Sequence, residues 1–199
     1  MMMDVIPGVP EPKDEWTEQE LAQAILMVAE MEYQGQPLFE MSSWVKVDSM
    51  PNTYIDTIDV LDLPRDWNYE DIGGFPSQLV LEIGEAPPCG TTMCIAGWAA
   101  YFTKWKMHHL AINATRDGEW KGVDNIGHDA LGLNTYALFY TGNEVGLQFL
   151  RWLAAGVKLR GGNDVYKMER LFNRDVDITE ITDPEKLDAA YATIPPVEN

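Results

Sequence analysis

Apolar residues recur at intervals of three and four along residues 18–33, which is the spacing of one buried face of an α-helix. Thr17 and Glu20 stand at the start of this pattern in a capping-box arrangement, in which each side chain caps a backbone N–H of the other residue. Gly35 follows and can adopt the left-handed conformation that ends many helices. The pattern therefore predicts a first helix over residues 18–33.

The pattern changes over residues 38–88, where short apolar segments are bounded by proline, glycine and asparagine. β-Branched and aliphatic residues are enriched in these segments, which favours strands over helices. The sequence predicts a small, acidic sheet inserted ahead of the next helix, with its strands near residues 45–48, 54–60 and 79–83.

The most apolar part of the chain follows two prolines and begins with two threonines that can cap a helix. We expect this helix to begin near Thr92 and to extend over residues 92–104. It is apolar nearly all round, so it should be buried at the centre of the fold. One of its faces carries only small residues, which would let another helix approach closely: Ala96, Gly97 and Ala100.

The C-terminal half contains several short helical patterns separated by glycine, asparagine and proline. Asn143 and Asn163 are candidate caps for two of these helices, and Asp183 followed by Pro184 is typical of a third helix start. We therefore predict an α+β fold: a mainly helical single domain over residues 17–199 with a central buried helix and a small inserted β-sheet. Residues 1–16 are rich in proline and are predicted to form an extended arm.

Charge is the strongest compositional signal, because the net charge is −18. Residues 1–88 hold 18 acidic and 3 basic residues, a net charge of −15, whereas residues 89–199 have a net charge of −3. Direct binding to nucleic acid or to an anionic membrane needs clustered lysine and arginine, so neither is expected. A protein partner with a basic surface would instead be attracted. No long apolar run or secretory leader pattern is visible, so we expect a cytoplasmic protein of a bacterial host cell.

Three fragments of the chain are similar to one family. They run over residues 39–44, residues 89–99 and residues 130–140, and they contain a Met-x-x-Trp element, a Cys-Gly-Thr-x-x-Cys-Ile-Ala-Gly-Trp-Ala helix start and a Leu-Gly-Leu turn. In this order they resemble small uncharacterised proteins of actinobacterial phages and their hosts. The resemblance implies a phage or mobile-element context and supplies no activity.

Cys89 and Cys94 are the candidate chemical groups. Their spacing differs from that of common zinc knuckles, and in a cytosol they would remain reduced, so no metal site and no cofactor is expected. A cysteine near a helix N-terminus could be an activated nucleophile if His109 or His128 served as its base. The alternative is that Cys94 is a small core residue and Cys89 a turn residue.

The sequence favours a non-catalytic, phage-type accessory protein that binds a host or viral protein through an acidic surface. One alternative is a nucleic-acid mimic that inhibits a DNA- or RNA-binding defence protein, and another is a cysteine-dependent hydrolase. Acidic residues and aromatic side chains of the kind that dominate interfaces lie together in the predicted insertion. They form the predicted protein-binding site: Asp56, Asp59, Asp62, Asp66, Trp67, Tyr69 and Phe75.

Overall fold

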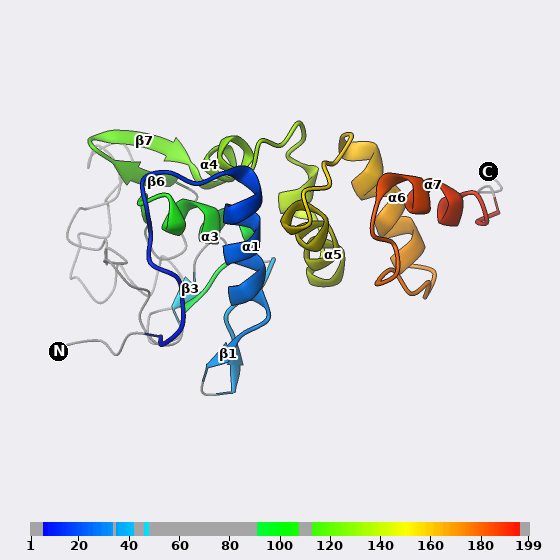
Figure 1. Cartoon of the computed structure of the whole chain (residues 1–199), viewed down its shortest axis with the longest axis horizontal. Helices are drawn as coiled ribbons and strands as arrows, with labels where there is room; N and C mark the ends of the chain where they lie inside the picture. Colours follow the sequence, from blue (N-terminus) through cyan, green and yellow to red (C-terminus); the bar gives the residue numbers. More distant parts are fainter. Residues whose placement is uncertain (1–5, 34, 42–45, 48–90, 108–112, 196–199) are drawn as a thin grey trace, which may run out of the picture.

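The computed structural model describes residues 6–33, 35–41, 46–47, 91–107 and 113–195. Within these residues the chain is a mainly helical α+β domain, as predicted, with three small antiparallel sheets (Figure 1). The helices are α1 (Glu18–Ala29), α3 (Ile95–Phe102), α4 (Val123–Ala130), α5 (Asn143–Ala154), α6 (Gly162–Phe172) and α7 (Pro184–Tyr191), with a 3₁₀ turn η1 (Ala137–Tyr140). The strands are β1 (Glu32–Tyr33), β2 (Gln36–Pro37), β3 (Lys46–Val47), β4 (Thr91–Thr92), β5 (Lys106–Met107), β6 (Asn113–Arg116) and β7 (Glu119–Gly122).

Helix α3 lies at the centre of the core, and all eight of its residues are buried. This confirms the expected central helix, but its start was predicted wrongly. Helix α3 begins at Ile95, where Cys94 is the N-cap and its sulfur accepts a hydrogen bond from the Gly97 N–H at 3.4 Å. Thr92 cannot start the helix, because β4 pairs with β3 and holds this backbone extended. The helix also ends before Lys104, which adopts a φ of 62°.

The small-residue face of α3 accommodates α4, as the sequence predicted. Gly127 of α4 lies directly on Ala96, so closely that a Cβ atom on Gly127 would be 2.9 Å from the Ala96 Cα atom. It would also lie 3.0 Å from the Phe139 ring. Glycine therefore sets the distance between the two helices.

Helix α1 has the predicted capping box. The Thr17 hydroxyl accepts from the Glu20 N–H, and the Glu20 carboxylate accepts from the Thr17 N–H at 3.0 Å. The helix ends at Ala29 rather than at residue 33, because β1 and β2 form a hairpin directly after it. Gly35, with a φ of +79°, belongs to the turn of this hairpin and does not cap the helix.

The first helix packs mainly against α5. The side-chain amides of Gln19 and Gln23 both donate to the carbonyl of Ala154, the last residue of α5, at 3.1 and 3.0 Å. Backbone carbonyls at a helix C-terminus have no partner within their own helix. Side chains of α1 therefore cap the C-terminus of α5.

Strands β3 and β4 pair antiparallel, with Lys46 opposite Thr92 and Val47 opposite Thr91. The segment between them, residues 48–90, is called the acidic segment below; it holds nine acidic residues and one basic residue, a net charge of −8. The pairing brings the two ends of this segment together at one place on the core. Strand β3 confirms the predicted strand near residues 45–48, whereas the strands predicted over 54–60 and 79–83 lie outside the described residues.

A three-stranded sheet, β5-β6-β7, was missed by the sequence analysis. Asp117 and Gly118 connect β6 to β7 and both have positive φ, 52° and 83°. An Asp-Gly pair between two short strands is a strong signal for a tight hairpin turn. The signal was present in the sequence, but the sequence analysis assigned no element to this segment.

Of the three predicted caps in the C-terminal half, only Asp183 is confirmed; it accepts hydrogen bonds from the N–H groups of Glu185 and Lys186. Asn143 and Asn163 were predicted wrongly, because the N-caps of α5 and α6 are the glycines that precede these helices. Asn143 is the first residue of α5, and its side chain bonds elsewhere.

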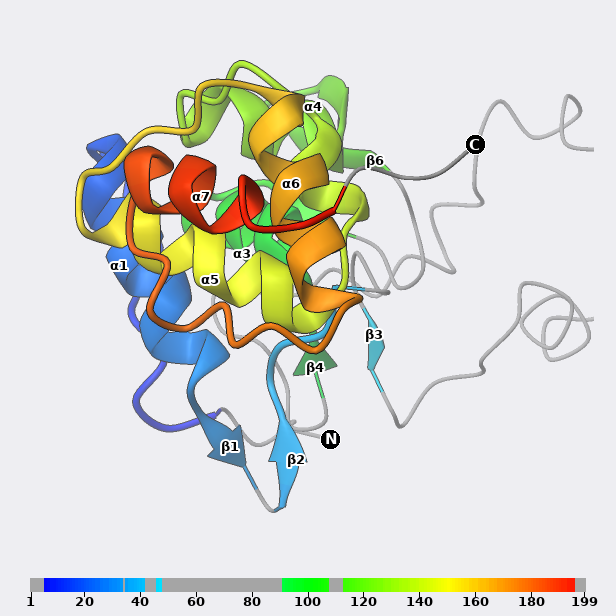
Figure 2. The ribbon, with the colours of Figure 1, turned by 90° about the vertical axis from the view of Figure 1, so that its right-hand side faces the viewer.

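Helices α6 and α7 cover one side of α5 (Figures 1 and 2). The Arg160 guanidinium bridges them, since it bonds to the buried carboxylate of Asp164 at 2.7 Å and to Asp188 of α7 at 2.7 Å. Side chains of α5 bind two carbonyl groups of the segment between α6 and α7, and the Gln148 amide donates to the first of them, Thr179, at 3.2 Å. The Ile181 carbonyl accepts from the Gln148 amide at 2.7 Å and from the Trp152 indole at 2.6 Å.

We expect Gly127→Ala to lower the free energy of unfolding by about 1–3 kcal/mol, because overpacking against the Ala96 backbone outweighs the helix propensity of alanine. Gly146→Ala in α5 is the matched control. Its Cβ would lie 3.0 Å from the Met41 side chain, so its nearest neighbour is a side chain and not a helix backbone. Urea unfolding of both variants measures the difference, and equal stabilities would contradict the close helix approach.

Candidate functional site

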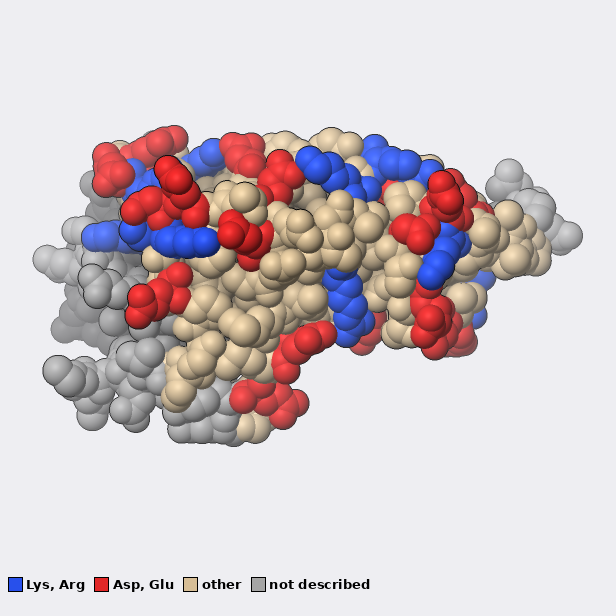
Figure 3. All heavy atoms as spheres, viewed as in Figure 1, with Lys and Arg blue, Asp and Glu red and all other residues tan. Residues whose placement is uncertain are grey.

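The predicted protein-binding residues cannot be placed, because all seven lie outside the described residues: Asp56, Asp59, Asp62, Asp66, Trp67, Tyr69 and Phe75. Cys89, His108 and His109 also lie outside them. The described residues carry 21 of the 32 acidic residues and 13 of the 14 basic ones. Among the described residues on the face drawn in Figure 3, acidic and basic side chains are interspersed.

Cys94 has the environment of a core residue. It is 1% exposed, and burial raises the pKa of its thiol to about 11. The hydrogen bond from the Gly97 N–H opposes this shift but is the weaker cause. The thiolate is therefore disfavoured at neutral pH, which is the opposite of what a nucleophilic cysteine needs.

The His128 side chain of α4 contacts Tyr136 and Asp129. Its ring stacks on Tyr136 with a centroid distance of 4.3 Å, and Nδ1 lies 3.2 Å from a carboxylate oxygen of Asp129. Asp129 also binds the Lys121 ammonium at 2.6 Å. Among the described residues, no group of three or more histidine, cysteine, aspartate or glutamate side chains could hold a metal ion.

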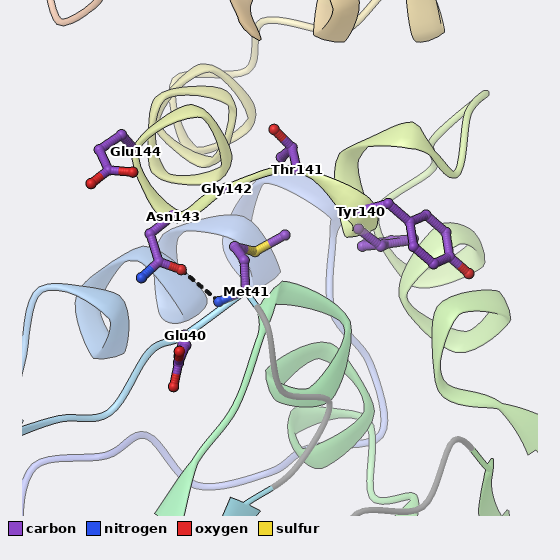
Figure 4. Close-up of a pocket in the computed structure, with 8 residues that line it drawn as sticks. Glu40, Met41, Tyr140, Thr141, Gly142, Asn143 and Glu144 are labelled. Carbon is purple, nitrogen blue, oxygen red and sulfur yellow. Dashed lines mark hydrogen bonds between the residues drawn. The ribbon is translucent and has the colours of Figure 1, made fainter. Parts of the chain in front are cut away.

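The described residues form an open pocket of about 530 Å³ between residues 39–41 and the start of α5 (Figure 4). Its lining comes from two segments about a hundred residues apart in the chain: Glu40, Met41, Phe139, Tyr140, Thr141, Gly142, Asn143 and Glu144.

Three local features build this pocket. Phe39 forms a parallel bridge with Met93, which fixes residues 39–41 beside the start of α3. The Asn143 side chain accepts a hydrogen bond from the Met41 N–H at 2.7 Å, as Figure 4 shows. Gly146 leaves room for the Met41 side chain on α5. The wall of the pocket is therefore held by backbone contacts from two sides.

The lining combines acidic groups with an apolar and aromatic surface. In Figure 4 the carboxylates of Glu40 and Glu144 lie on the same side as Asn143, and Tyr140 projects on the other side of Met41. Tyr140 is 67% exposed, and its hydroxyl donates to Asp124 at 3.2 Å. Desolvation and then the Asp124 carboxylate raise the pKa of Tyr140, so the phenol remains a neutral donor.

Thr141 is the unusual residue of the pocket. It is buried, and its hydroxyl has no hydrogen-bond partner among the described residues. A buried polar atom without a partner is costly, and such atoms are rare in folded proteins.

Sequence analysis missed this pocket, because no local pattern links its two segments. The three fragments singled out in the sequence analysis nevertheless meet near it. Residues 39–41 belong to the first fragment and Met93 to the second, while Phe139 and Tyr140 belong to the third. Their convergence in space is the signal that the sequence alone could not supply.

Comparison of the chain with protein-family models, with curated proteins and with solved structures found no match. None of the helices in the described part of the chain is both long enough and apolar enough to span a bilayer.

We expect Cys94 in the folded chain to react with iodoacetamide at pH 8 roughly 100-fold or more slowly than an ordinary thiol, because a pKa of about 11 leaves little thiolate. Tandem mass spectrometry locates the label, and the same reaction in urea provides the unfolded control. Fast, selective labelling of folded Cys94 at pH 6 would identify a reactive thiol and favour the hydrolase hypothesis over the binding role.

Proposed function

We propose that this chain is a non-catalytic accessory protein of the phage type, which binds a protein partner with a basic surface. The observation that carries the proposal is the concentration of negative charge in the acidic segment, at −8 over residues 48–90. Such a charge speeds the encounter with a basic surface. The phage context rests on the sequence resemblance alone.

The described core supports this proposal as a scaffold. The β3–β4 pair closes the base of the acidic segment next to the central helix, so the segment leaves and rejoins the core at one place. Binding residues are often carried by segments that a rigid core positions. The raised pKa of Cys94 also argues against this residue as the nucleophile of a hydrolase.

Charge reversal within the acidic segment tests the proposal. We expect the combined change of Asp56, Asp59, Asp62 and Asp66 to lysine to abolish capture of a basic partner from a bacterial lysate while the chain stays folded. Association of the wild-type chain with the captured partner should slow as salt rises, because a Debye length of about 8 Å at physiological ionic strength screens a steered encounter.

A matched variant distinguishes the effect of charge in the acidic segment from the effect of the total net charge. Glu119, Glu169, Glu180 and Glu185 are described residues outside the acidic segment in the sequence, and changing them to lysine alters the net charge by the same amount. This control should retain the partner. Equal loss in both variants, or binding that ignores salt, would overturn the proposal. Competition by duplex DNA for the same partner would favour the nucleic-acid mimic.

A further inference from the structure

We draw no further inference here: the strongest candidate, the exposed surface patch in which Arg170 of α6 donates to the Tyr166 hydroxyl beside Tyr191 of α7, carries none, because nothing in the described part of the chain shows what covers it.

Discussion

The constraint on which the fold depends is the complete burial of α3. A helix without a polar face must be covered on every side, and the elements packed around α3 provide this cover. Helix α4 lies on its small-residue face, and the indole of Trp98 donates to the Leu38 carbonyl at 2.9 Å. The N-terminal residues close another side, where Trp16 donates to the Phe102 carbonyl at 2.9 Å. The pocket inherits its geometry from the same packing, because Met93 holds residues 39–41 in place.

Sequence reasoning succeeded where the decisive contacts are local. The caps at Thr17 and Asp183 join atoms two or three residues apart, and both are present as predicted. It failed where a distant segment competes for the same atoms. Asn143 has the side chain of a good cap, but it bonds to Met41 instead, 102 residues away in the chain. Thr92 could have started a helix, but its backbone pairs with β3.

The candidate sites also differ in whether local sequence or tertiary packing determines them. The sequence left Cys94 as either a nucleophile or a small core residue, and the tertiary packing favours the core residue, because Cys94 is buried and burial raises its pKa. The pocket was invisible, since Glu40 and Glu144 have no relation along the sequence. The acidic segment, in contrast, could be recognised from composition, because net charge does not depend on how a chain folds.

The capping of the C-terminus of α5 by side chains of α1 has a consequence for synthesis of the chain. Gln23 and the carbonyl that it caps are 131 residues apart. A ribosome adding about 5–20 residues per second needs roughly 7–26 s to cover that distance. Throughout this interval the apolar face of α1 has been made, but the helix that covers it has not. The nascent chain therefore exposes Leu21, Ile25 and Val28, which are buried in the finished protein, until α5 has emerged.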